Sequence, residues 1–282
     1  MLKSEQLPAL LREIPNSPKH LYLRGELPPT DWKWLAVVGS RAITSYGKQA
    51  CEHLISGLRG YPIVIVSGLA LGTDGEAHRA ALRAGLPTVG VPGSGLGWDT
   101  LYPRTHVNLA REILDAGGAL LSEYGDDFRA APYTFPERNR VMVGLTHATL
   151  VIEAKEKSGS LITARMAADY NRELLVVPGS IFSETSRGTH QFLKLGALPA
   201  TEPADILRAL GLEVRSADPA QLTLRTDLSP SEQRVLTLIA SSIPRDELLR
   251  ALDIPTQEAQ VLLSMMEIKG LIAEEIGVIR AK

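Results

Sequence analysis

The chain has 282 residues, of which 44% are hydrophobic and 22% are charged, and its formal net charge is −2 at pH 7. This length allows one or two domains with a full hydrophobic core, and the composition is that of an ordinary soluble globular protein. The slightly acidic balance argues against a protein that coats nucleic acid through bulk charge, although a local basic groove is compatible with it.

Targeting, disulfide and metal signals do not stand out in the sequence. No apolar run approaches the ~18 residues that span a membrane. The first residues are too mixed and too acidic for a signal peptide, so a cytoplasmic protein is expected. The single Cys51 excludes an internal disulfide and is interpreted as a buried packing residue. The six histidines lack metal-ligand spacing, and neither a metal nor a cofactor is predicted.

Residues 1–33 are Pro-rich and are expected to form a short preamble with one helix at 7–14. From Trp34 onward, apolar runs alternate with amphipathic segments. Strands are predicted at 35–38, 63–67, 87–91, 119–122, 149–153 and 174–177, with helices at 45–59, 75–84, 105–116, 136–147 and 160–171. Uniformly apolar strands separated by helices predict an α/β domain at 34–211, a Rossmann-like open parallel sheet with helices on both faces.

The C-terminal part of the chain changes character. Residues 212–226 are interpreted as a linker, and 227–282 predict three helices and a terminal hairpin, the pattern of a small winged helix-turn-helix domain. Ser229 and Pro230 form a typical helix start. From Thr226 onward there are six basic and nine acidic residues, and the presumed recognition helix carries only Lys269. A protein-interaction or packing role is therefore favoured over duplex reading.

Three predicted strands end in Gly/Ser turns that lead into helices. The turns are Gly39-Ser40-Arg41, Ser67-Gly68 and Ser158-Gly159-Ser160, the last followed by Thr163. Backbone N–H groups at a helix N-terminus hold anions such as phosphate, and ligands of open parallel sheets bind at the carboxyl ends of the strands. Each turn taken alone is equally explained as a tight connection. Three along one edge, with an arginine in the first, favour a binding site.

Several motifs occur in a fixed order along the chain. They are GSR, SGLALGTDGEAH, GSGLGWDTLYP, LLSEY, FPERNR, SGSLITAR and VVPGS. With them the chain closely resembles the DprA/Smf family from about Leu7 to Leu210, and its tail resembles the small winged-helix domain of many members. The longer N-terminal helical domain of many members is not present in this sequence.

The resemblance implies a bacterial single-stranded DNA-binding protein without catalytic turnover. It implies protection of incoming single strands, loading of the RecA recombinase during natural transformation, and a homodimer formed through the Rossmann-like domain. Carried onto this sequence, the implied DNA-contacting positions are Gly39, Ser40, Arg41, Ser67, Gly68, Phe135, Arg138, Asn139, Arg140, Ser158, Gly159, Ser160 and Thr163, with Lys155 and Lys157 extending the basic rim.

Some of these residues have structural alternatives. Phe135 is either a base-stacking face or a core residue. Arg140 is either a phosphate contact or an ion-pair partner of Glu153 or Glu137. Asp74 and His78 lie one helical turn apart, and a buried hydrogen bond that fixes the second turn is favoured over an acid–base pair. The segment 191–198 is the candidate dimer face, although its apolar residues are equally explained as core.

Two other classes of function fit the same superfamily. Nucleotide phosphoribohydrolases carry an arginine and a glutamate whose positions fall near Arg138 and on Met166. Because methionine cannot act as a general acid or stabilise a ribosyl cation, a binder is favoured over an enzyme. A nucleotide-sensing regulator, with a small phosphorylated ligand at the three turns, stays open.

Overall fold

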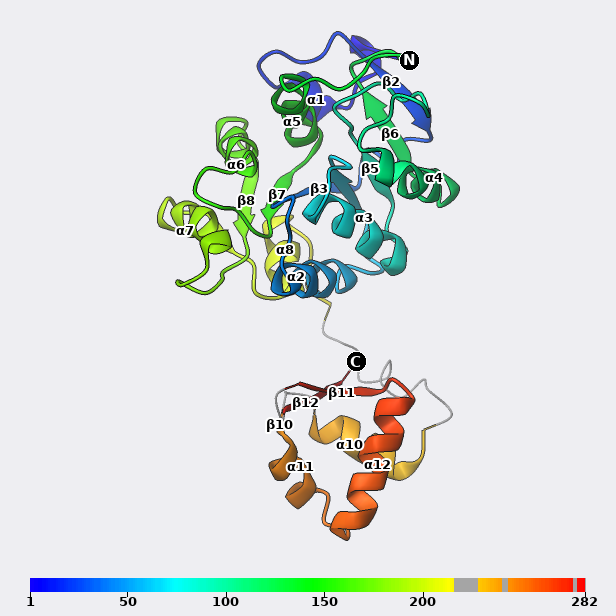
Figure 1. Cartoon of the computed structure of the whole chain (residues 1–282), viewed down its shortest axis with the longest axis vertical. Coiled ribbons are helices and arrows are strands. Elements are labelled where there is room, and N and C mark those ends of the chain that lie inside the picture. The colour runs from blue at the N-terminus through cyan, green and yellow to red at the C-terminus, as the bar shows by residue number, and fades with distance from the viewer. Residues whose placement is uncertain (216–227, 240–242, 276–277, 282) are drawn as a thin grey trace. The chain divides into compact units, whose positions relative to one another are not determined.

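A computed structural model of the chain describes residues 1–215, 228–239, 243–275 and 278–281. The chain divides into two compact units, Met1–Val214 and Arg215–Lys282 (Figure 1). Most of the expected linker at 212–226 lies outside the described residues.

The first unit is built on one sheet with the strand order β1-β2-β6-β5-β4-β3-β7-β8-β9. The strands from β3 to β9 pair in parallel with one another, and the parallel pairing of β3 to β8 was predicted. Their bounds are β3 Lys33–Val38, β4 Ile63–Ser67, β5 Thr88–Gly90, β6 Ala119–Ser122, β7 Ala148–Val151, β8 Glu173–Val176 and β9 Leu198–Pro199. Strand β3 lies between β4 and β7, so the strand order reverses direction there and leaves a crevice at the carboxyl edge.

Helices cover both faces of this sheet. They are α1 Ala9–Arg12, α2 Ser45–Ser56, α3 Thr73–Ala84, α4 Val107–Asp115, α5 Thr134–Leu145, α6 Ser160–Asp169, α7 Arg187–Lys194 and α8 Pro203–Ala209, with short 3-10 turns η1 Ser4–Gln6, η2 Arg104–His106 and η3 Glu184–Ser186. On one face, Leu54 and Leu207 pack with Leu35. On the other, Met142 and Ala164 pack with alternate residues of the same strands. The fold class expected from the sequence is confirmed.

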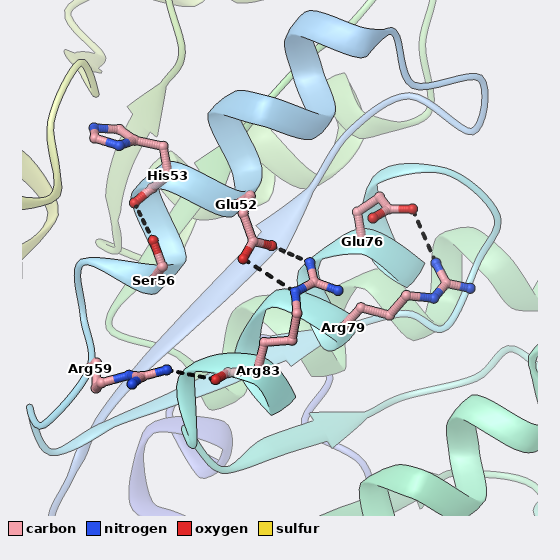
Figure 2. A network of polar contacts seen from close by, with 7 residues as sticks. All are labelled: Glu52, His53, Ser56, Arg59, Glu76, Arg79 and Arg83. Atoms are coloured by element: carbon pink, nitrogen blue, oxygen red, sulfur yellow. Dashed lines mark hydrogen bonds and ion pairs between the residues drawn. The ribbon is translucent and has the colours of Figure 1, made fainter. Parts of the chain in front are cut away.

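A polar network joins α2 and α3 on their exposed sides (Figure 2). The Arg83 guanidinium pairs with both carboxylate oxygens of Glu52. Arg59 Nη2 donates to the Arg83 carbonyl over 2.8 Å. Glu52 and Arg83 lie near the C-terminal ends of α2 and α3, so this network joins the two helices at those ends. Cys51 is buried beneath it, as predicted.

The N-terminal segment differs from the expected preamble. Strand β2, His20–Gly25, pairs antiparallel with β6, and β1, Leu2–Lys3, pairs antiparallel with β2. The helix expected over 7–14 is the shorter α1. Leu11 and Leu21 are fully buried in the core of the sheet, so this segment belongs to the first unit.

The second unit has the winged-helix arrangement predicted from the sequence. Its elements are α10 Pro230–Leu238, β10 Ile243–Pro244, α11 Arg245–Ala251, α12 Thr256–Ile268, β11 Ile272–Glu275 and β12 Val278–Ala281. Ser229 and Glu232 form a reciprocal capping box at the start of α10, which satisfies two terminal backbone donors. Leu263 and Met266 of α12 pack against Leu248 and Ile279.

Candidate nucleic-acid interface

The turns after β3 and β7 border a cavity of about 750 Å³ at the carboxyl edge of the sheet. Three segments supply most of the lining, 38–42, 132–142 and 155–163, and Ala70 and Asp74 complete it. The site therefore combines the end of β3, the first half of α5 and the start of α6. It lies where the strand order reverses, the usual position of a ligand in an open α/β sheet.

Most of the residues singled out in the sequence line this cavity. They are Gly39, Ser40, Arg41, Phe135, Arg138, Asn139, Lys155, Lys157, Ser158, Gly159, Ser160 and Thr163. Ser67, Gly68 and Arg140 are not part of the lining. Ser67 is fully buried, and its hydroxyl donates to the Val37 carbonyl over 2.7 Å.

Hydrogen bonds tie the turn after β3 to the two helices beside it. The Ser40 carbonyl accepts from the backbone N–H of Thr73 at 3.0 Å, at the start of α3. The Gly39 carbonyl accepts from the Ser160 hydroxyl at 2.8 Å, at the start of α6. A Cβ on Gly39 would lie 2.5 Å from Thr73 Oγ1, so only glycine fits this approach. Arg41 is left exposed at the rim.

The turn after β7 presents a helix start to the cavity. Helix α6 begins at Ser160, and the Ser158 hydroxyl accepts from the Ser160 backbone N–H at 3.3 Å. The Ser158 hydroxyl lies 3.1 Å from the Ser160 hydroxyl. Exposed Lys155 and Lys157 border this turn. Lys155 also pairs with Glu184 over 3.4 Å on the surface. The positive end of the helix dipole and the ammonium groups of Lys155 and Lys157 together favour an anion here.

Arg138 lies in the floor of the cavity and is only 6% exposed. Its Nη1 donates to the Val91 carbonyl, and its Nε has no hydrogen-bond partner among the described residues. Burial lowers the pKa of the guanidinium, and the nearby charge of Asp74 opposes that change. A buried cation beside an open cavity favours binding of an anion, because an anion would compensate its lost hydration.

Asp74 fixes the second turn, in agreement with the sequence analysis. Its Oδ2 accepts from the N–H groups of Gly68 at 3.1 Å and Ala70 at 3.3 Å. Burial raises the pKa of this carboxyl group, and the Arg138 charge acts against the rise. The hydrogen bonds of Asp74 and His78 go to other groups and not to each other, contrary to the expected pairing. The Nδ1 atom of His78 lies 2.7 Å from the Thr88 hydroxyl.

Phe135 is half-buried between two side chains of the rim. The Arg41 guanidinium carbon lies 5.1 Å from the centre of the Phe135 ring, a cation–π contact. The Tyr102 ring lies 5.7 Å away on a tilted plane. Phe135 is thus neither a core residue nor a fully exposed face, and it holds Arg41 over the cavity.

Arg140 is engaged elsewhere. Its Nη2 donates to Glu123 at 2.6 Å, and its Nη1 donates to the Asn16 carbonyl at 2.6 Å. The prediction that Arg140 pairs with Glu153 or Glu137 was therefore wrong. Glu153 instead accepts from the backbone N–H and hydroxyl of Thr44.

Several lining residues were not singled out in the sequence. Met142 lies one helical turn beyond Arg138, and Ile162 lies in the first turn of α6. Pro132 and Pro136 flank Phe135. The helical period of α5 was the signal that could have identified Met142, because residues four apart share a helix face.

Comparison with known proteins identifies the family. The family model described as DNA recombination-mediator protein A matches residues 1–211, and that of the DprA winged helix domain matches residues 217–277. This chain belongs to the DNA recombination-mediator protein A family. Within that DprA family, Protein Smf of Escherichia coli is 44% identical over 211 residues, which cover 73% of this chain and 55% of Smf. The matched part thus spans about half the length of that relative.

Two solved DprA structures share the fold. DprA of Streptococcus pneumoniae is 38% identical with a TM-score of 0.66, over 74% of this chain and 71% of that one. DprA of Helicobacter pylori is 32% identical with a TM-score of 0.64, over 72% of this chain and 92% of that one. The second structure is described for its single-stranded DNA binding mode.

One further observation concerns the hydrolase alternative, and a second concerns membrane-spanning helices. Met166, on which the hydrolase glutamate would fall, lies on α6 outside the cavity lining. Among the helices that the structure describes, none combines the length and apolar character needed to cross a membrane.

Proposed function

We propose that the chain binds single-stranded DNA in the cavity at the carboxyl edge and acts as a recombination mediator. The observation that carries this proposal is the combination of exposed Arg41, buried Arg138 and the start of α6 around one cavity. The single-stranded DNA binding described for the Helicobacter pylori relative supports the same assignment.

The proposed DNA contacts are of three kinds: phosphate contacts, base stacking and hydrogen-bond donors in the floor of the cavity. Phosphate oxygens bind the Arg41 guanidinium, and Lys155 and Lys157 at the mouth, beside the positive end of the α6 dipole. A base stacks near Phe135, whose ring already carries the Arg41 guanidinium. Arg138 and Asn139 provide donors in the floor. Ser67 and Gly68 act by shaping the second turn, and a DNA contact of Arg140 stays a prediction.

The mediator role extends the binding proposal. Family membership supports protection of incoming single strands and loading of RecA during natural transformation, with binding and no turnover. A homodimer through the Rossmann-like unit completes the proposal. On the segment 191–198, Phe192 is buried, whereas Leu195 and Leu198 are 79% and 42% exposed. Among the apolar side chains of the segment, Leu195 and Leu198 are the exposed ones and are available as a dimer face.

We further propose that the winged-helix unit binds a protein rather than duplex DNA. Lys269, the basic residue that ends the presumed recognition helix, donates to Glu232 at 2.8 Å. Exposed side chains on α12 include Val261, Met265 and Ile268, which are 60%, 49% and 81% accessible. An apolar stripe without free cations suits a protein partner better than a phosphate backbone.

The test is fluorescence anisotropy of a labelled ~30-nucleotide oligo-dT across a salt series, for wild type and Arg41→Ala. We expect binding that weakens with salt and an affinity reduced about tenfold or more in Arg41→Ala. Arg79→Ala is the matched control, because Arg79 pairs with Glu76 on the surface of α3, outside the cavity. An absence of binding at low salt would reject the proposal. Affinity independent of oligonucleotide length would instead favour a small nucleotide ligand.

A further inference from the structure

The segment that follows β5 borders the nucleic-acid interface without lining its cavity. The Val91 carbonyl accepts a hydrogen bond from Arg138 in the cavity floor. A Cβ on Gly93 would lie 2.8 Å from Cδ1 of Phe135, so the Phe135 ring lies directly on the backbone of this segment. Residues 91–103 therefore share the rim of the site with the start of α5.

Tyr102 is exposed although its neighbours in this segment are buried. Leu101 and Pro103 on either side are buried, whereas Tyr102 is 48% exposed. The Tyr102 backbone N–H donates to the hydroxyl of Ser94 at 3.1 Å, and Ser94 is itself fully buried. The backbone is thus anchored at and around Tyr102, while its side chain is left at the surface.

The Tyr102 ring extends a row of side chains that starts at Arg41. The centre of the Phe135 ring lies 5.1 Å from the Arg41 guanidinium carbon and 5.7 Å from the centre of the Tyr102 ring. Arg41, Tyr102 and the backbone at Gly93 together cover much of Phe135, which is half-buried. Of the two rings, Tyr102 therefore offers the larger open aromatic surface.

We propose that Tyr102 is a base-stacking residue, which binds the base next to the one at Phe135 in a strand that leaves the cavity. The proposal rests on the single-stranded DNA binding proposed above. Stacking needs an open aromatic face that is held in place, and it tolerates every base. The two ring planes are inclined by 52°, so bases stacked on them are splayed apart and the strand turns there. A base-paired strand keeps its bases parallel, so this arrangement favours single strands over duplex.

The competing explanation is that Tyr102 only supports Phe135 by packing against it. A double-mutant cycle separates the two explanations, because a residue that acts only through Phe135 has no effect once Phe135 has been replaced. A residue that stacks a base of its own still contributes in that background.

The first measurement is the anisotropy of a labelled ~30-nucleotide oligo-dT across a salt series, for wild type, Tyr102→Leu and Tyr102→Phe. We expect Tyr102→Leu to bind about fivefold more weakly and Tyr102→Phe to bind like wild type, because phenylalanine keeps the ring. Tyr102→Leu should retain the salt dependence of wild type, since it loses no phosphate contact, whereas Arg41→Ala should weaken that dependence. Tyr61→Leu is the matched control and should bind like wild type, because Tyr61 precedes β4 at the opposite, amino edge of the sheet. Thermal unfolding checks that each variant is folded.

The double variant Phe135→Leu/Tyr102→Leu completes the cycle. We expect Tyr102→Leu to weaken binding at least about threefold further in the Phe135→Leu background. No further loss would mean that Tyr102 acts through Phe135 alone, and would overturn the proposal. In wild type, photo-crosslinking of an oligomer that contains 5-iododeoxyuridine should modify Tyr102. Crosslinks at Phe135 or at Tyr133, which is 57% exposed, without any at Tyr102 would also overturn it.

The outcomes separate this proposal from the one on which it rests. Equal affinity of wild type and Tyr102→Leu, or an equal loss in Tyr102→Leu and Tyr102→Phe, overturns the stacking role. Single-stranded DNA binding at the cavity stands in that case if Arg41→Ala still loses affinity. Failure of wild type to bind the oligomer overturns both proposals.

Discussion

Gly68 lies directly against the guanidinium of Arg138. A Cβ built at position 68 would lie 1.8 Å from Arg138 Nη1, closer than any tolerated contact. The second Gly/Ser turn thus acts on the site indirectly, by leaving room for a buried arginine in the floor of the cavity.

Gly68→Ala should therefore displace Arg138 and reduce the free energy of unfolding by about 1–3 kcal/mol, the usual cost of overpacking. Urea denaturation measures the change. Gly159→Ala is the matched control, because a Cβ there meets nothing within 4 Å and the backbone φ is −59°. Equal stability of the two variants would show that Arg138 moves aside without cost.

Acid should destabilise the first unit through His78. Burial lowers the pKa of His78 from its ordinary 6.5 to about 3. Between these values the unfolded chain binds a proton that the folded chain does not, so stability falls as the pH decreases. The loss approaches about 1.4 kcal/mol per pH unit for this one group. The raised pKa of Asp74 acts in the opposite direction, because the folded chain binds a proton at pH values where the unfolded carboxyl has lost it.

His78→Asn isolates this effect, because the asparagine amide can still donate to Thr88. We expect lower stability than wild type at pH 7 and a smaller loss between pH 6.5 and 5. Chemical denaturation at several pH values measures both quantities. Parallel pH profiles for the two proteins would contradict the assignment.

The sequence predicted the parallel strands well, because they are buried on both faces and read as continuous apolar runs. It missed β2, in which apolar residues alternate with polar ones. This strand pairs antiparallel with β6, about 95 residues further along the chain, and such a long-range contact leaves no local signal. It located most of the cavity lining, because Gly/Ser turns after parallel strands share one edge. It could not predict that Arg138 is buried or that Arg140 meets Glu123, since both depend on the packing of α5 against distant segments.

Arg140→Ala should affect stability more than DNA binding. The variant loses contacts to Glu123 and to the Asn16 carbonyl, which together link α5 to β6 and the N-terminal segment. We expect the free energy of unfolding to fall by about 1–2 kcal/mol, with oligo-dT affinity changed less than threefold, on the order of 0.6 kcal/mol. Arg79→Ala removes a surface pair and serves as control. A large loss of affinity with unchanged stability would make Arg140 a DNA contact.

The winged-helix unit should also lose stability in acid, through a different group. The Lys269 ammonium and the N–H of Ser229 lower the pKa of Glu232 from its ordinary 4.5 to about 2. The carboxylate therefore stabilises the fold above pH 4.5, and this contribution is lost as the pH falls toward 2. Glu232→Gln should increase amide exchange across α10 at pH 6 relative to wild type. Unchanged exchange would mean that Ser229 alone caps the helix.

Phe135→Leu tests whether the aromatic ring itself contributes to binding. Leucine keeps most of the buried volume, so we expect the free energy of unfolding to fall by less than about 1.5 kcal/mol. The variant removes the aromatic ring, which contacts Arg41 and provides the stacking face. We therefore expect oligo-dT affinity to fall at least about fivefold, on the order of 1 kcal/mol per stacked base. Phe128→Leu is the control, because Phe128 stacks on Tyr124 outside the cavity lining. Equal affinities of the two variants would assign Phe135 to packing alone.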